Sequence, residues 1–158
     1  MTKIEAGVMI DRPAEVVWKF LTDFSNFPKI DPDILEVKQT SAGPLAVGTT
    51  LEANRKKEGK VSFRTVEYDP GRKLSLEVTS PRMMEGSKET VIMEGIGGKT
   101  KLTHVWDLRL GGFYRLMGPF VARNLGKVAG TQVSNIKRIL ESEAQTVLTR
   151  RDNVQRVI

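Results

Sequence analysis

The 158-residue sequence contains no cysteine and only one histidine, His104. Without cysteine, disulfide bonds, thiolate nucleophiles and cysteine-ligated metals are all excluded. A metal site would have to rely on carboxylates. The nearest candidates, Asp23, Asp31 and Asp33, lie in a segment interrupted by prolines, which favours turn and capping roles. We therefore expect neither a bound metal nor another cofactor.

Long apolar runs are also missing. No run approaches the roughly 18 residues that a membrane-spanning helix needs, and residues 1–13 lack the basic and apolar stretches of a signal peptide. With 39% hydrophobic and 28% charged residues, the composition is that of a globular domain of ordinary size. These features predict a cytoplasmic protein without stable membrane insertion.

Aromatic residues make up only 6% of the chain, and the net charge is +6. A positive charge permits nucleic acid or acidic membranes as partners. The lysines and arginines, however, are scattered through apparent turns and are not interleaved with aromatic residues as in an RNA-binding strand motif. The glycines at 95, 97 and 98 lack the strand-to-helix context of a phosphate loop. We expect a mostly solvated basic surface and no nucleic-acid partner.

The N-terminal two thirds of the chain shows mainly strand and turn patterns. Residues 3–10 alternate between apolar and polar side chains, which predicts a half-buried strand. Pro13 then suits the first turn of a short helix, and residues 23–33 predict a helical turn and a loop. From 34 to 110, short segments separated by turns such as Asp69-Pro70-Gly71 predict an antiparallel meander.

The remaining sequence predicts a long helix from about Phe113 to about Glu143. Gly118-Pro119 should kink or restart this helix, as proline does. Gly126 and Gly130 are four residues apart and therefore share a face. They either permit close packing of the helix on the sheet or leave room for a ligand.

The last residues, 146–158, are polar and basic. They are either the end of the long helix or a frayed extension. We expect one folded domain over residues 1–145, in which the helix buries one face of the sheet. The fold class is therefore α+β, with two short helical segments after the first strand.

Four segments give the sequence a familiar order. They are an opening strand leading into DRPAEVVWKFLTDFSNFPKI, then DILEVKQTSAGPLAVGTTLE, TVEYDPGRKLSLEV, and GGKTKLTHVWDLRL followed by the long helix. In this order and spacing the chain resembles the START-like, or helix-grip, SRPBCC superfamily. Within it, the chain is most similar to the polyketide cyclase/dehydrase and lipid-transport family. The resemblance covers about residues 3–143.

The resemblance implies a curved antiparallel sheet that grips the C-terminal helix, with a cavity between them. Members of such families hold hydrophobic or amphipathic molecules, including lipids, isoprenoids and polyketides, and some catalyse ring closure or dehydration. The superfamily shares a cavity shape rather than a catalytic motif, so the fold alone does not distinguish carriers from enzymes.

The last predicted strand, LTHVWDLRL, is the strongest source of candidate site residues. His104 and Trp106 share its more apolar face by period two, so they should lie beside the cavity. His104 is either a general base or hydrogen-bond donor or a core histidine bonded to a neighbour, and the second interpretation is favoured. Trp106 is interpreted as core wall rather than as a stacking platform.

The other candidate lining residues come from the sheet, the loop after residue 80 and the long helix. Met83 and Met84 either form an adaptable cavity mouth or pack on their own domain. The full predicted lining is Leu74, Leu76, Val78, Met83, Met84, Leu102, His104, Trp106, Leu108, Met117, Phe120 and Leu125.

Three arginines fall within predicted strands, namely Arg55, Arg64 and Arg109. An arginine that pointed inward could bind a ligand carboxylate through two hydrogen bonds. Arg109 should point outward by alternation, and a bulge between Phe63 and Val66 would decide the direction of Arg64. We expect all three side chains to be exposed.

Three classes of function remain compatible with these patterns. The favoured hypothesis is a carrier or sensor of a hydrophobic small molecule, held in a mainly apolar cavity. The alternative is a metal-free cyclase, aromatase or dehydratase, which needs two or more polar groups converging in the cavity. The third is a protein-interaction module, which predicts a filled cavity and an exposed apolar patch.

Overall fold

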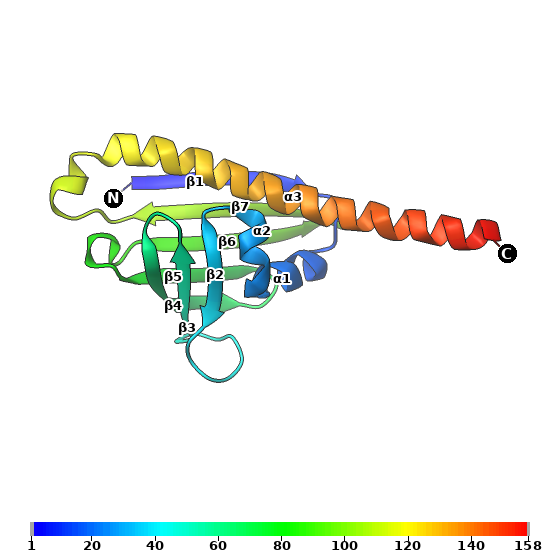
Figure 1. Cartoon of the computed structure of the whole chain (residues 1–158), viewed down its shortest axis with the longest axis horizontal. Helices are drawn as coiled ribbons and strands as arrows, with labels where there is room; N and C mark the ends of the chain where they lie inside the picture. The colour runs from blue at the N-terminus through cyan, green and yellow to red at the C-terminus, as the bar shows by residue number, and fades with distance from the viewer. Residues whose placement is uncertain (1, 158) are drawn as a thin grey trace.

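The computed structural model describes residues 2–157, whose strands form a curved antiparallel sheet (Figure 1). Across the sheet the strands lie in the order β1-β7-β6-β5-β4-β3-β2, so β2 to β7 form a meander and β1 closes onto β7. The predicted antiparallel meander is confirmed. The bounds of the strands are β1 (Thr2–Ile10), β2 (Ile34–Gln39), β3 (Thr50–Arg55), β4 (Gly59–Asp69), β5 (Lys73–Ser80), β6 (Lys88–Ile96) and β7 (Lys99–Leu108).

Two short helices follow the first strand, as predicted. Helix α1 (Ala14–Thr22) begins directly after Pro13 and buries Val17, Phe20 and Leu21. A 3-10 turn, η1 (Phe24–Asn26), leads into α2 (Phe27–Ile30). Two further 3-10 turns, η2 (Arg82–Met84) and η3 (Gly112–Arg115), lie in loops.

Helix α3 (Gly118–Val157) crosses the sheet and continues past it (Figure 1). Pro119 lies in its first turn, where a missing amide hydrogen is harmless, so the glycine–proline pair starts the helix instead of kinking it. The predicted first helical piece, from Phe113, forms η3 rather than α-helix. The helix ends at Val157 rather than near Glu143, because it runs on through the basic tail.

The pairing of β4 with β5 is irregular on both sides of Arg64. Its register shifts between Ser62 and Phe63 and again between Thr65 and Glu67, and the second shift overlaps the position of the predicted bulge. The Arg64 side chain points to solvent and forms an ion pair with Glu77 at 3.2 Å. Arg109 is also exposed, as expected from alternation.

The apolar core lies between the sheet and the helices and has two parts. The larger part joins β1, α1, β7 and the middle of α3, where Val133, Ile136 and Leu140 are buried at helical spacing. The smaller part joins Ile4 and Trp106, which are register partners in β1 and β7, to Ala129 of α3. Two cavities, described below, lie between these core parts and the outer strands.

Candidate functional site

Two adjoining cavities lie between the inner face of the sheet, the α2 segment and α3. The first has a volume of about 80 Å³ and extends over β3, β4 and β5. The second has a volume of about 40 Å³ and lies toward α1. They share four lining residues, Phe27, Leu76, Glu89 and Gln132. The remaining lining is mostly apolar, which suits an apolar guest.

Eight of the twelve sequence-predicted residues line these cavities. They come from β5, η2, β7 and α3, in keeping with a pocket between sheet and helix. Strands β5 and β7 each contribute the side chains of their more apolar face. The eight are Leu74, Leu76, Val78, Met84, Leu102, His104, Trp106 and Leu125.

The other four lie elsewhere. Leu108 is on the inward face of β7, but it is packed into the smaller core part beneath the start of α3. Met83 is exposed, and its neighbour Met84 takes the inward position. Met117 and Phe120 are exposed as well. Phe120 lies off the inward face of α3, which passes through Val121 and Leu125, because each residue turns the helix by about 100°. Met117 precedes the first residue of α3. Phe113 and Leu116 in the same segment are also exposed.

Arg55 corrects one sequence expectation, because its side chain is only 15% exposed and lines the first cavity. It was expected in solvent on account of its charge. The signal that could have placed it is alternation, since Leu51, Ala53 and Arg55 occupy every second position of β3. Both Leu51 and Ala53 are buried, and Arg55 continues their row toward the cavity.

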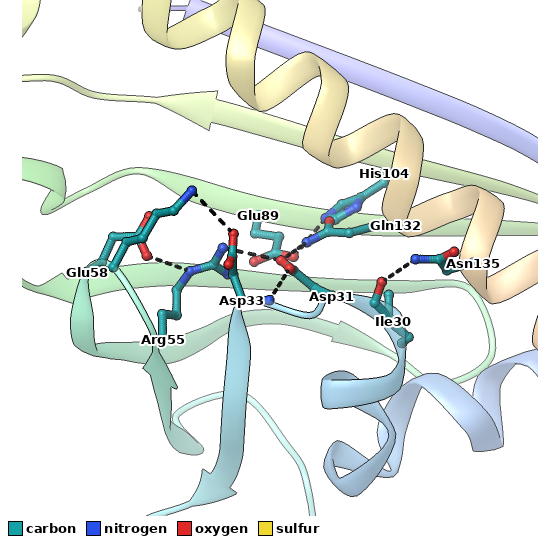
Figure 2. Close-up of polar contacts among 10 residues, drawn as sticks. Ile30, Asp31, Asp33, Arg55, Glu58, Glu89, His104, Gln132 and Asn135 are labelled. Carbon is teal, nitrogen blue, oxygen red and sulfur yellow. Dashed lines mark hydrogen bonds and ion pairs between the residues drawn. The ribbon is translucent and has the colours of Figure 1, made fainter.

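A buried carboxylate, Asp31, explains how this charge is held inside (Figure 2). Asp31 Oδ2 accepts hydrogen bonds from Arg55 Nη2 at 3.2 Å and from Gln132 Nε2 at 3.0 Å. Arg55 Nε donates to Glu58 Oε2 at 3.1 Å. Burial acts to lower the pKa of Arg55, but the carboxylates of Asp31 and Glu58 outweigh it, and the pKa is raised. Arg55 is therefore a permanent cation between two anions.

The same contacts fasten α3 to the rim of the cavity. Gln132 binds Asp31 just after α2, and one turn later Asn135 Nδ2 donates to the carbonyl oxygen of Ile30 at 2.8 Å. Sequence reasoning did not single out Gln132 or Asn135. The position of Gln132 could have indicated its burial, because Gln132 precedes the buried Val133 and lies four residues before the buried Ile136 on the helix.

A second polar pair lies across β6 and β7. His104 Nε2 lies 2.8 Å from Glu89 Oε1, and both side chains are largely buried and line the second cavity. The His104 ring also contacts Trp106, with ring centroids 5.5 Å apart. A histidine held by a carboxylate at a cavity wall is compatible both with a general base and with a core histidine bonded to a neighbour, so both sequence interpretations of His104 stay open.

Two buried polar atoms of the cavity lining lack a hydrogen-bond partner among residues 2–157. They are the indole Nε1 of Trp106 and the amide Oε1 of Gln132. Trp106 and Gln132 both line the first cavity. A buried donor or acceptor without a partner is costly, so each of these two atoms lowers the stability of the folded state.

The two helix glycines do not line either cavity. A Cβ added at Gly126 would meet Ile4 Cγ2 of β1 at 3.9 Å, which is ordinary contact, so this glycine lies where α3 packs on the sheet. A Cβ added at Gly130 would meet no atom within 4 Å. The two glycines therefore do not enlarge either cavity.

We expect Gly130→Ala to raise the free energy of unfolding by about 0.5–1 kcal/mol, because alanine favours the helical backbone and has room there. Urea denaturation of the variant and the parent chain measures the difference. Gly98→Ala is the control. The φ angle of Gly98 is 81°, so alanine there should destabilise the fold. A destabilised Gly130→Ala variant would contradict the open space at this position.

Within the described part of the chain, no group of three or more histidine, aspartate or glutamate side chains is placed to hold a metal ion. Nor does any helix in residues 2–157 have the length and apolarity to cross a bilayer.

The sheet, the gripped helix and the cavity between them define a helix-grip domain. The chain belongs to the polyketide cyclase / dehydrase and lipid transport family, whose model matches residues 1–141. No curated protein matches the chain.

Solved structures share the fold at low identity. The di-domain ARO/CYC BexL from the BE-7585A biosynthetic pathway is 19% identical, with a TM-score of 0.73 over 89% of this chain and 47% of BexL. StfQ, the di-domain ARO/CYC from the steffimycin biosynthetic pathway, is 12% identical, with a TM-score of 0.73 over 90% of this chain and 52% of StfQ. TTHA0849 from Thermus thermophilus is 14% identical, with a TM-score of 0.72 over 89% of this chain and 99% of TTHA0849. The chain thus spans about half of each di-domain protein.

Proposed function

We propose that the protein binds a hydrophobic or amphipathic small molecule, such as a lipid, isoprenoid or polyketide, in the adjoining cavities between the sheet and α3. The observation that carries this proposal is the largely apolar lining, contributed by strands β2 to β7, the α2 segment and α3. Membership of a family that includes lipid transport supports it. Binding without catalysis requires only a cavity of this shape with this lining.

Filling the cavity should abolish binding. Leu76 lines both cavities, so Leu76→Trp places an indole in the shared space. We expect the affinity for the neutral apolar dye N-phenyl-1-naphthylamine, measured by fluorescence titration, to fall at least about tenfold, because the dye loses its apolar contacts. Leu35→Trp is the matched control, since Leu35 is an exposed strand leucine, and it should leave the affinity within about twofold. Equal affinities in the three proteins would place the dye outside the cavities and contradict the proposal.

An enzyme of the cyclase, aromatase or dehydratase type is the second candidate, and the His104–Glu89 pair is the observation that favours it. A neutral His104 would accept a proton from a carbon or hydroxyl of a guest, and Glu89 would stabilise the resulting imidazolium. The BexL and StfQ structures, whose names describe ARO/CYC proteins, have the same fold.

A turnover assay with poly-β-ketone substrates separates the two candidates. If the protein is an enzyme, His104→Gln should lower turnover by at least about 100-fold, since it removes the base. It should leave dye affinity within about twofold, since it preserves much of the side-chain volume. Turnover that survives this change would rule out His104 as the base, and a carrier shows no turnover in either protein.

A further inference from the structure

The segment between β7 and α3 forms one extreme end of the molecule, opposite the C-terminus (Figure 1). It exposes large apolar side chains, with Phe113 at 72%, Leu116 at 81% and Phe120 at 61%. We infer that this apolar tip, residues 113–120, and the basic residues around it dock the protein reversibly on the surface of a lipid bilayer with anionic headgroups. The inference goes beyond the proposed function and does not depend on it.

Two of the apolar side chains leave the apolar tip in the same direction. Phe113 lies in the 3-10 turn η3, and the backbone amide of Leu116 donates to the carbonyl oxygen of Phe113 at 3.1 Å. Side chains three residues apart in such a turn eclipse one another, so Phe113 and Leu116 form one apolar pair. Tyr114, which is 43% exposed, adds a ring with a polar end, and such rings are enriched at membrane interfaces. An exposed apolar pair of this kind can be buried at the boundary between headgroups and acyl chains.

The charges on this part of the chain have one sign. Residues 108–140 contain no aspartate or glutamate, and their basic residues are Arg109, Arg115, Arg123, Lys127, Lys137 and Arg138. Arg109 and Arg115 line one surface pocket of about 320 Å³ at the base of the apolar tip. Within residues 2–157, neither of these arginines nor Arg123 forms an ion pair. Their charges are therefore available to an external anionic surface.

The first turns of α3 extend the positive charge on the side of Phe120. Arg123 and Lys127 follow Phe120 by three and seven residues, so the three share one face of the helix, and all are exposed. Attraction between basic residues and anionic headgroups acts over a Debye length of about 8 Å at physiological ionic strength. Docking therefore requires that the positive charges lie at this end of the molecule, and it requires no fixed distance between them.

The loop after β5 lies beside the base of the apolar tip, because the backbone amide of Arg109 donates to Ser87 Oγ at 2.9 Å. This loop exposes Arg82, Met83 and Glu85. It thus adds apolar surface at the same end, and the charges of Arg82 and Glu85 cancel. The positive potential of this end is preserved.

A second copy of the chain matches this surface less well than a bilayer does. In a two-fold symmetric pair the same surface meets itself, so Arg109, Arg115 and Arg123 would approach their own counterparts and repel them. An anionic bilayer instead supplies the opposite charge and, directly beneath it, an apolar layer for Phe113 and Leu116. Charge complementarity therefore favours the bilayer.

Flotation of the full-length protein with lipid vesicles tests the inference. We expect binding to vesicles of phosphatidylcholine and phosphatidylglycerol in equal parts to be at least about tenfold stronger than binding to phosphatidylcholine alone. Added salt should weaken the interaction with the anionic vesicles. Equal binding to the two kinds of vesicle would overturn the role of charge, and binding to neither would overturn the inference as a whole.

A pair of charge variants tests the position of the basic residues. Arg115→Gln/Arg123→Gln should lower the affinity for the anionic vesicles by about 10- to 30-fold, because it removes two cations beside the apolar tip. Arg150→Gln/Arg151→Gln is the control, since it changes the net charge equally at exposed positions near the other end of α3. It should lower the affinity by less than about threefold. Equal losses would show that net charge, and not this surface, attracts the protein to the vesicles.

A pair of apolar variants tests the contact itself. Phe113→Ser/Leu116→Ser should lower vesicle affinity at least about tenfold, because it removes the apolar pair. Leu35→Ser/Val47→Ser is the control, since these residues are 51% and 64% exposed elsewhere on the molecule. It should change the affinity less than about twofold. Unchanged binding by Phe113→Ser/Leu116→Ser would overturn the assignment of the apolar tip.

Two further measurements separate the remaining explanations. Sedimentation equilibrium without vesicles detects self-association, and a dimer that only Phe113→Ser/Leu116→Ser abolishes, in a protein that binds no vesicles, would assign the apolar tip to a second copy. Binding of N-phenyl-1-naphthylamine should stay within about twofold of the parent value in Phe113→Ser/Leu116→Ser, since neither residue lines the two cavities. Dye binding by a protein that binds no vesicles would overturn the docking inference and leave the proposed function standing.

Discussion

Arg55→Met is expected to lower the free energy of unfolding by about 3 kcal/mol, because it leaves Asp31 as a buried carboxylate without its cation. Asp31 is only 6% exposed at its side chain, so bulk water solvates this carboxylate poorly. Gln132 would remain as its one side-chain donor. Urea denaturation followed by circular dichroism measures the change.

Arg64→Met supplies a closely matched control. Arg64 lies on the neighbouring strand and contacts Glu77 at 3.2 Å, the distance that also separates Arg55 from Asp31. The two pairs differ in exposure, which is 54% and 26% for Arg64 and Glu77 against 15% and 6% for Arg55 and Asp31. An exposed pair contributes about 0–1 kcal/mol, so Arg64→Met should have a small effect. Equal losses in the two variants would show that burial does not govern the Arg55 pair.

The double variant Arg55→Met/Asp31→Leu tests the cause. If the loss in Arg55→Met comes from the stranded carboxylate, removing that carboxylate should restore most of the stability, since an apolar pair can replace a buried ion pair. If the double variant is instead less stable than Arg55→Met, Asp31 stabilises the fold mainly through its hydrogen bonds, including the one that its own side chain accepts from the backbone amide of Asp33 at 2.9 Å.

Leu140→Ala is expected to have an effect of similar size, also about 3 kcal/mol. Leu140 is 1% exposed and packs in the larger core part with Ile10 and Leu102, so truncation leaves a cavity there. Leu148→Ala, on the same helix, should cost less than about 0.5 kcal/mol, because Leu148 is 59% exposed. Thermal and urea denaturation of the two variants provide the comparison.

The contrast between these leucines bears on where the folded domain ends. We also propose that it ends near residue 145, although α3 runs on to Val157. A chain that stops after Ala144 should therefore unfold cooperatively and keep its stability within about 1 kcal/mol, because the removed turns bury little. A large loss on truncation, or in Leu148→Ala, would show that the last turns of α3 belong to the core.

Local patterns were sufficient to predict the sheet and the β7 wall of the cavity. Period-two alternation predicts that His104 and Trp106 are buried, and turn residues predict the ends of the strands. The direction of Arg64 could not be predicted from alternation, because the register of β4 shifts on both sides of it, and the sequence had indicated an irregularity in this stretch.

The polar network could not be predicted in the same way, because it joins residues that are far apart along the chain. Asp31 and Gln132 are separated by 101 positions, and each looks unremarkable in its own segment. Asp31 lies among prolines that favour a turn, and Gln132 is a polar residue within an amphipathic helix. The burial of Arg55 was missed because its charge was weighed above its place in the alternation of β3. Only the tertiary arrangement of α2, β3 and α3 brings the three residues together.

The exposed segment between β7 and the second turn of α3 has a practical consequence for the protein in solution. Phe113, Leu116 and Phe120 present apolar surface there, while the net charge of +6 keeps the molecules apart by repulsion. Salt screens this repulsion, and sulfate also strengthens apolar association. Colloidal stability should therefore fall as sulfate is added, and the protein should be retained on phenyl media and remain dispersed at low ionic strength.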